Sequence, residues 1–122
     1  MRFLLDTDVM SAYIKRPALL AHRFLQNSGR LALPTIVLAE LYHWAYARPD
    51  PAPMVDSIQK LFALAEILDF DPASAETFGR LRADLSKRGV TVAPPDLIIA
   101  STALTHGLTV VSSATSISRP AW

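Results

Sequence analysis

The sequence alternates short, mostly apolar runs with longer segments of helical periodicity, and this alternation leaves few possible architectures. The runs lack the apolar–polar alternation of a strand with one solvated face, so we expect strands that are buried on both faces and paired in parallel. The fold class predicted is therefore a three-layer α/β/α domain with a central parallel β-sheet. The predicted strands cover residues 3–5, 30–33, 67–70 and 108–111, and the predicted helices cover residues 8–14, 18–26, 36–46, 54–65, 72–87 and 97–106.

Residues with strong capping preferences mark the borders of several predicted helices. Thr35 is expected to cap the helix that follows it, because its hydroxyl can accept a free N–H group of the first turn. Asp71 followed by Pro72 is typical of a helix start, and Gly107 is typical of a helix end. No repeat or low-complexity tract interrupts this pattern, so we expect one domain over residues 1–122.

The composition excludes several classes of protein. The chain has no cysteine, which excludes a disulfide framework, a thiolate metal site and a cysteine nucleophile. Although 51% of the residues are hydrophobic, no apolar run reaches the length of a membrane span, and the N-terminus does not resemble a secretory signal. A cytoplasmic protein is therefore predicted. The net charge of +1 indicates that any nucleic acid would be bound locally and not over the whole surface.

Three carboxylates are candidates for a functional site. Asp6 directly follows the first predicted strand, and ligands of an open parallel sheet bind beyond the carboxyl ends of its strands. Glu40 lies inside an apolar helix, where an unpaired buried carboxylate costs several kcal/mol and needs a cation nearby. Asp96 lies near the start of another apolar helix, so it is either a site residue or a helix cap.

The metal that such a site would bind follows from the ligand chemistry. Oxygen ligands without cysteine or a histidine cluster favour Mg²⁺ or Mn²⁺ over zinc. Glu40 and His43 have the Glu-x-x-His spacing of a di-iron bundle, but the sequence lacks the second copy that such a site requires. The histidines His22, His43 and His106 are too scattered to form a ligand set and are expected to be structural or surface residues.

Four segments carry a resemblance to a known family. LLDTDVMS at residues 4–11, TIVLAELYHW at 35–44 and PPDLIIASTALTHGLTVV at 94–111 resemble the three motifs of the PIN domain. DPASAETFGRLRADLSKRG at residues 71–89 is similar to the helix before the third motif in VapC-type toxins. The resemblance runs in order along nearly the whole chain. It implies a parallel sheet flanked by helices, which agrees with the fold predicted above.

The resemblance also implies a function and a set of site residues. The family's metal-binding acids correspond to Asp6, Glu40 and Asp96, and Thr7 and Asp8 occupy positions that often assist through hydrogen bonds. The implied activity is that of a metal-dependent endoribonuclease, the toxin of a toxin–antitoxin pair, in which Mg²⁺ or Mn²⁺ activates water for in-line attack on an RNA phosphate. Asp8 has an alternative role as the cap of the helix that it begins, and we favour that role.

The chain departs from the family pattern after the last predicted strand. The family has a hydroxyl residue followed by an Asp or Asn there, whereas this chain has Ser112 and Ser113, so Ser113 stands in the place of a fourth acid. A hydroxyl brings no negative charge, and a second cation should bind more weakly. Residues 116–122 also look shortened and are not expected to form a last strand.

Partners are implied by the resemblance, namely an RNA substrate, a small antitoxin protein and a second copy of the chain, without a membrane. Basic side chains on the helix over residues 72–87 are candidates for RNA contact, with a solvated helix face as the equal alternative. The residues concerned are Arg80, Arg82, Lys87 and Arg88. Candidate apolar contacts to a partner, for which core packing is the favoured alternative, are Trp44, Tyr46, Leu61 and Phe62.

Two other functions are compatible with parts of the pattern. The missing fourth acid leaves open a catalytically weakened PIN domain that acts mainly as a protein-binding module. A receiver-like signalling domain has similar length and a parallel sheet with an aspartate pocket, but it requires a lysine at the end of a late strand. Val111 is followed by Ser112, which disfavours the receiver.

Overall fold

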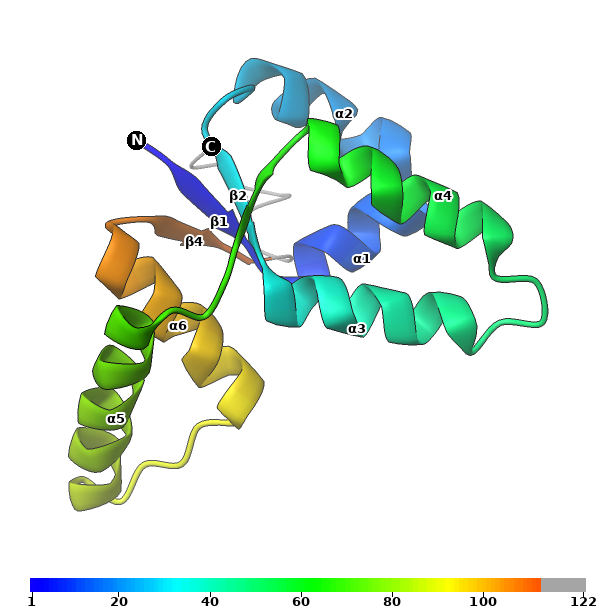
Figure 1. Ribbon diagram of the computed structural model, residues 1–122. Helices are drawn as coiled ribbons and strands as arrows, with labels where there is room; N and C mark the ends of the chain where they lie inside the picture. The colour runs from blue at the N-terminus through cyan, green and yellow to red at the C-terminus, as the bar shows by residue number, and fades with distance from the viewer. Residues whose placement is uncertain (113–122) are drawn as a thin grey trace.

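A computed structural model describes residues 1–112 and contains a sheet of four parallel strands in the order β3-β2-β1-β4 (Figure 1). The strands are β1 (Phe3–Leu5), β2 (Leu31–Pro34), β3 (Glu66–Leu68) and β4 (Thr109–Val111). In the centre of the sheet, Leu4 pairs with Ala32 of β2 and with Val110 of β4. Because all strands are parallel, their carboxyl ends meet at one edge. The predicted α/β/α fold is confirmed.

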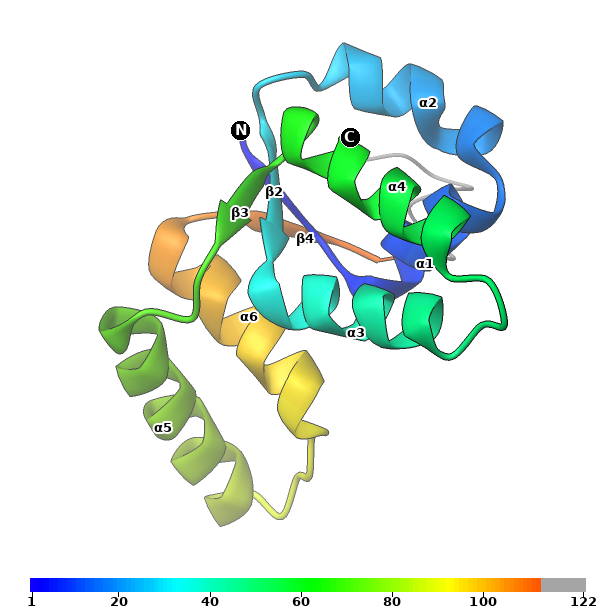
Figure 2. The same cartoon turned by 45° about the vertical axis from the view of Figure 1, so that its right-hand side comes forward.

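The helices form two layers, one on each face of the sheet (Figures 1 and 2). One face carries α1 (Thr7–Lys15), α2 (Pro17–Gln26), α3 (Thr35–Tyr46) and α4 (Ala52–Lys60), and a short 3-10 helix η1 (Leu61–Ala63) follows α4. The other face carries α5 (Pro72–Lys87) and α6 (Pro94–His106). Within the described part of the chain, no helix has the length and apolar character needed to cross a bilayer.

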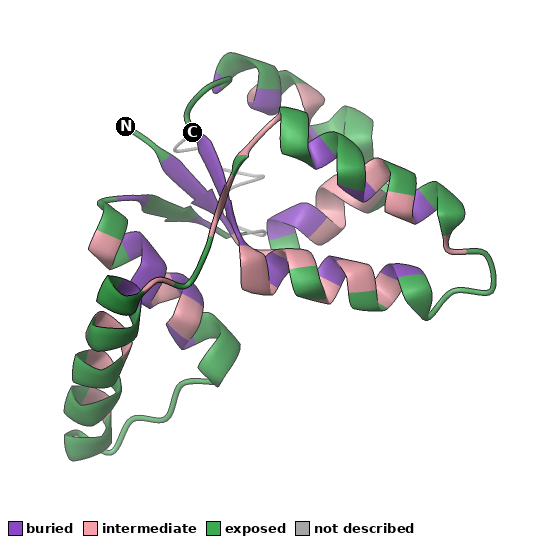
Figure 3. Ribbon diagram, in the orientation of Figure 1, coloured by how far each residue is buried: buried purple, intermediate pink, exposed green. Residues whose placement is uncertain are grey.

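The hydrophobic core lies between the strands and the helices that touch them. β1 and β2 are buried at every position, which explains their uninterrupted apolar sequence (Figure 3). α5 packs against α6 and buries only Ser74 among its own residues, so most of its surface is exposed. The fold therefore consists of a packed body and one outer helix held by its neighbour.

Several predicted borders differ from those in the structure. The helix predicted over residues 54–65 begins at Ala52 and ends at Lys60, where the chain tightens into η1. The strand predicted over residues 67–70 is Glu66–Leu68, because the register with β2 ends where Pro34 pairs with Leu68 and α3 begins. The helix predicted over residues 97–106 begins earlier, with Pro94 in its first turn, where the fixed φ of proline suits a helix.

The helix borders predicted at Asp71 and Gly107 are confirmed, and the cap predicted at Thr35 is wrong. Asp71 caps α5 by accepting a hydrogen bond of 2.7 Å from the backbone N–H of Ser74. Gly107 ends α6 in the left-handed region with φ of 66°, which glycine adopts without steric cost. Thr35 is not a cap, because it is the first residue of α3 and the capping position belongs to Pro34, which makes no side-chain bond there.

Candidate functional site

Asp6 lies at the carboxyl end of β1 and caps α1. Its Oδ1 accepts a hydrogen bond of 2.9 Å from the backbone N–H of Val9, and its own N–H donates to the Val111 carbonyl oxygen at 3.3 Å. The prediction that Asp8 caps this helix is therefore wrong, because Asp8 is already inside the first turn and its side chain is exposed. Asp6 thus has a structural role that is independent of any ligand.

Glu40 lies on α3 and is joined to the start of α1 by Thr7. The Thr7 hydroxyl donates a hydrogen bond of 3.0 Å to Oε1 of Glu40 across 33 positions of sequence. This contact follows from the topology, because β1 and β2 are neighbours and the helices that follow them pack side by side. Glu40 is half-buried, so the full burial expected from its apolar neighbours is wrong, and one of its carboxylate oxygens accepts the hydrogen bond from Thr7.

Asp96 is an exposed residue in the first turn of α6. The capping position of this helix belongs to Ala93, so the interpretation of Asp96 as a helix cap is wrong. A negative charge in the first turn is favoured by the free N–H groups there. The carboxylate of Asp96 is therefore not required as a helix cap.

The electrostatics of Asp6 reflect its burial first and its acidic neighbours second. Burial raises the pKa of the Asp6 carboxyl, and the negative charges of Asp8 and Asp96 raise it further. Hydrogen bonds from the backbone of Val9 and Asp8 act in the opposite direction without cancelling these effects. The ionised form of Asp6 is thus disfavoured, and a bound cation would relieve both the burial and the repulsion.

The ligand chemistry fits a hard divalent cation, because the charged groups that act on Asp6 are the carboxylates of Asp8 and Asp96. The arrangement is nevertheless open. Within residues 1–112, no three carboxylate or imidazole groups lie close enough together to hold one metal ion between them. The structure brings Thr7 to Glu40 and the charge of Asp96 to Asp6, but it does not form a closed ligand cage.

Of the two serines that follow the last strand, the structure describes Ser112 but not Ser113. Ser112 is exposed and directly follows β4, and because Leu5 pairs with Val111 it leaves the sheet at the same edge as Asp6. Ser113, the residue in place of the fourth acid, lies outside the described residues, as do residues 116–122.

The basic side chains proposed for RNA contact are all exposed on α5 and at its end. Two of them are in ion pairs within the helix surface, Arg80 with Glu76 at 2.7 Å and Arg88 with Asp84 at 2.6 Å. Arg82 and Lys87 make no ion pair with any residue of the described range. α5 therefore has less free positive charge than its sequence suggested.

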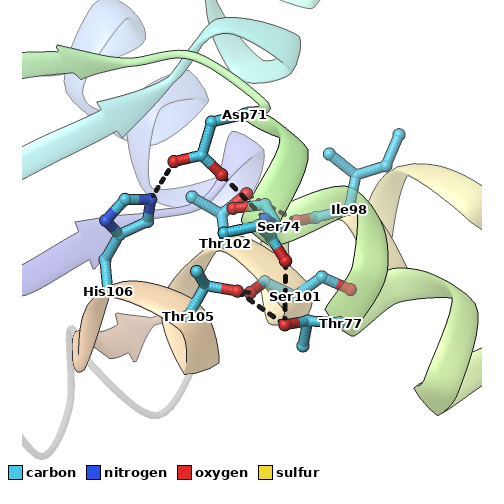
Figure 4. Close-up of polar contacts among 9 residues, drawn as sticks. Asp71, Ser74, Thr77, Ile98, Ser101, Thr102, Thr105 and His106 are labelled. Carbon is cyan, nitrogen blue, oxygen red and sulfur yellow. Dashed lines mark hydrogen bonds and ion pairs between the residues drawn. The ribbon is translucent and has the colours of Figure 1, made fainter.

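The structure also sorts the remaining candidates. Nε2 of His106 lies 3.0 Å from Oδ2 of Asp71 and so joins the end of α6 to the start of α5 (Figure 4). This contact is the structural role expected of His106. Among the proposed partner contacts, Tyr46 and Phe62 are exposed and Trp44 is half-buried. Leu61 is 1% exposed and belongs to the core, so it is no surface anchor.

Sequence reasoning missed two basic residues, Lys15 and Arg48, which line a cavity together with Trp44. A signal for Lys15 was present, because it follows Asp8 by seven positions and therefore shares one face of the helix. Arg48 follows the last turn of α3, and only the packing of α3 beside α1 brings it to the same cavity.

Comparison with known proteins agrees with these features. The family model of the PIN domain matches residues 3–122. The ribonuclease VapC2 of Haemophilus influenzae is 35% identical over 114 residues, which are 93% of this chain and 86% of that protein. The tRNA(fMet)-specific endonuclease VapC of Shigella flexneri is 33% identical over 116 residues, with coverage of 94% and 88%.

Solved structures show the same similarity. The crystal structure of DNA-bound VapBC from Salmonella typhimurium matches with a TM-score of 0.87 and 31% identity, covering 96% of this chain and 89% of that one. The structure of VapBC2 from Rickettsia felis, bound to a DNA fragment from its promoter, matches with a TM-score of 0.85 and 25% identity. It covers 98% of this chain and 92% of that one.

Proposed function

The chain belongs to the PIN-domain family, and within it to the VapC ribonucleases, and on that premise we propose that Asp6, Glu40 and Asp96 bind Mg²⁺ or Mn²⁺ for RNA hydrolysis. The chain is an endoribonuclease of the toxin–antitoxin class. The single observation that supports the site best is the hydrogen bond from Thr7 to Glu40, because it joins the helix that Asp6 caps to the helix that carries Glu40.

Each acid contributes in a different way. The side chain of Asp6 is held in place by the N–H of Val9, so one of its oxygens is oriented before any ion binds. Glu40 is oriented by the hydroxyl of Thr7. Asp96 is exposed and has to turn toward the other two acids, because the described residues show no closed ligand set.

A divalent ion at this site would supply positive charge against the phosphate and would lower the pKa of a water for in-line attack. The chain itself then needs no nucleophilic side chain. Asp6, Glu40 and Asp96 would hold the ion, Thr7 orients Glu40, and Asp8 and Ser112 supply further polar groups at the same edge of the sheet.

The partners of the chain are proposed from its relatives. The neighbours from Salmonella typhimurium and Rickettsia felis are VapBC complexes, and we propose a cognate antitoxin for this chain. An RNA substrate, a homodimer, a cytoplasmic location and a single domain over residues 1–122 belong to the same proposal. Exposed Tyr46 and Phe62 are the candidate apolar contacts to a partner.

A catalytically weakened PIN domain is the second candidate function. It is favoured by one observation, the presence of Ser112 and Ser113 where the family has a hydroxyl residue followed by an acid. Such a protein would bind its antitoxin but hydrolyse RNA poorly at any metal concentration.

One experiment separates the two. The purified chain is incubated with RNA and Mg²⁺ or Mn²⁺, with and without chelator, and compared with Asp96→Asn and with Asp56→Asn, an exposed aspartate paired with Lys60 away from the site. We expect cleavage that chelator and Asp96→Asn abolish and that Asp56→Asn leaves unchanged. Cleavage that persists in chelator would refute the metal-dependent site, and no cleavage at all would favour the binding module.

A further inference from the structure

A cavity of about 230 Å³ opens between α1, α3 and the start of α4. Its inner lining includes Met54, which is buried, and Trp44, which is half-buried. Its rim carries two exposed basic side chains, Lys15 of α1 and Arg48 after α3. The cavity therefore combines an aromatic surface with positive charge.

A second, shallower hollow continues from this cavity along α1. The two share Ser11 and Lys15, and the second hollow reaches Asp8 at the start of the helix and Arg16 at its end. We call the combined surface the α1 track, defined by Asp8, Ser11, Lys15, Arg16, Trp44 and Arg48.

The basic side chains of the α1 track are not neutralised by ion pairs within the described part of the chain. Within residues 1–112, Lys15, Arg16 and Arg48 form no ion pair with a carboxylate. Lys60 and Arg80 of the same range are paired, with Asp56 and Glu76, whereas Arg82 and Lys87 are also unpaired but line no cavity together with an aromatic side chain. Unpaired basic side chains around a cavity favour an occupant that carries negative charge.

The aromatic side chain indicates what else the occupant contains. Single-stranded nucleic acids are bound where a positive groove follows the backbone and an aromatic side chain stacks on a base. Trp44 supplies the aromatic surface, and Lys15 and Arg48 supply charge at the same cavity. One cavity therefore offers basic side chains for a phosphate and an aromatic ring for a base.

The α1 track also leads away from the acids. Asp8, Ser11 and Lys15 lie at intervals of three and four residues and share one face of α1, whose capping residue is Asp6. At 1.5 Å per residue, Lys15 lies about 10 Å along the helix axis from Asp8. A strand whose phosphate sits at the acids can therefore extend along this face.

We propose that the α1 track binds the single-stranded RNA beside the cleaved phosphate, with one base stacked on Trp44 and flanking phosphates bound by Lys15 and Arg48. This inference rests on the proposed ribonuclease function and names the surface that holds its substrate. It differs from the expectation that the basic residues of α5 hold the RNA.

The test measures binding without catalysis. A short single-stranded oligoribonucleotide is titrated in chelator, in a Trp122→Phe background that leaves Trp44 as the single tryptophan, and Trp44 fluorescence and RNA affinity are followed. Variants are Lys15→Ala, Arg48→Ala and Trp44→Ala, with Trp44→Phe to keep an aromatic ring. The control is Lys60→Ala, which removes the same charge from an exposed lysine outside the track.

We expect RNA to quench Trp44 and Trp44→Ala to weaken binding about tenfold, with most of the affinity kept in Trp44→Phe. Lys15→Ala should lower the slope of log affinity against log salt by about 0.7, the value for one phosphate contact on a single strand. Lys60→Ala should leave that slope unchanged. The fluorescence and lysine measurements do not depend on whether Trp44→Ala folds.

Several results would overturn the inference. Unquenched Trp44 together with an unchanged salt slope in Lys15→Ala would remove RNA from the α1 track, and so would an absence of RNA binding. A loss of affinity for the antitoxin alone would assign the surface to a protein partner. Because no metal is present, a failure of the metal site appears only in the cleavage assay and is distinguishable from a failure here.

Discussion

Replacing Asp6 tests the two roles that the structure assigns to one side chain. Asp6→Asn keeps an oxygen that can accept the N–H of Val9, because asparagine is as good a helix cap as aspartate, but it removes the negative charge. Asp6→Ala removes both. The pair of variants therefore separates the cap from the charge at a single position.

The expected magnitudes follow from the observed contacts. Loss of a capping side chain costs about 1 kcal/mol, so Asp6→Ala should lower the melting temperature by roughly 3–5 °C for a domain of this size. Asp6→Asn should not lower it. Since the pKa of Asp6 is raised in the folded state, its protonated form contributes stability below pH 3.8 that is lost as the pH rises through the folded-state pKa. The stability of Asp6→Asn relative to the wild type should therefore grow over that range.

The assay combines thermal unfolding by circular dichroism with RNA cleavage. At neutral pH, Asp6→Asn should be folded and inactive, and Mn²⁺ should raise the melting temperature of the wild type more than that of the variant. Equal destabilisation by asparagine and alanine would refute the role of Asp6 as a cap that asparagine can replace. Full cleavage by Asp6→Asn would remove Asp6 from the metal site.

Two further predictions concern positioning and pH. Thr7→Val should raise the metal concentration needed for half-maximal cleavage about tenfold, because Glu40 loses the hydroxyl that orients it. Thr7→Ser keeps a hydroxyl and should need the same metal concentration as the wild type. An unchanged metal titration in Thr7→Val would contradict the orienting role of Thr7. Hydrogen bonding with Ser74, with a smaller effect of His106, lowers the pKa of Asp71, so its carboxylate stabilises the fold above pH 3.8 and this stability is lost as the pH falls through the folded-state pKa. The melting temperatures of wild type and Asp71→Asn should therefore differ most near neutral pH and converge in acid, and a constant difference would exclude this role.

The layered fold could be predicted from the sequence because its strands are buried on both faces. Phe3, Leu4 and Leu5 are consecutive apolar residues, a pattern that a half-exposed strand does not tolerate, and the structure buries all three. The end of β3 could not be predicted in the same way. It depends on where Pro34 stops pairing and α3 begins, which is a property of the neighbouring strand and not of residues 66–70 themselves.

The candidate acids could be named from the sequence, but their contacts could not. Asp6 follows an apolar strand, Glu40 and Asp96 lie in apolar helices, and the resemblance to the family joins the three. The sequence nevertheless predicted the cap of α1 at Asp8, because both aspartates have the chemistry of a capping residue. Only the backbone of Asp6, with ψ of 174°, has the extended conformation that a cap requires. Likewise, the bond from Thr7 to Glu40 depends on the parallel pairing of β1 and β2, which no short segment encodes.

The unequal constraints on the three acids suggest which one limits metal binding. Asp6 is held by the N–H of Val9 and Glu40 by the hydroxyl of Thr7, so both carboxylates are positioned by bonds that exist without an ion. Asp96 is exposed in the first turn of α6 and is not its cap. Since α6 carries α5 on its outer side, any change in how this pair of helices sits on the sheet changes the distance from Asp96 to Asp6. Affinity for the ion should therefore depend on the packing of α6, which lies on the other face of the sheet from α1, which Asp6 caps, and α3, which carries Glu40.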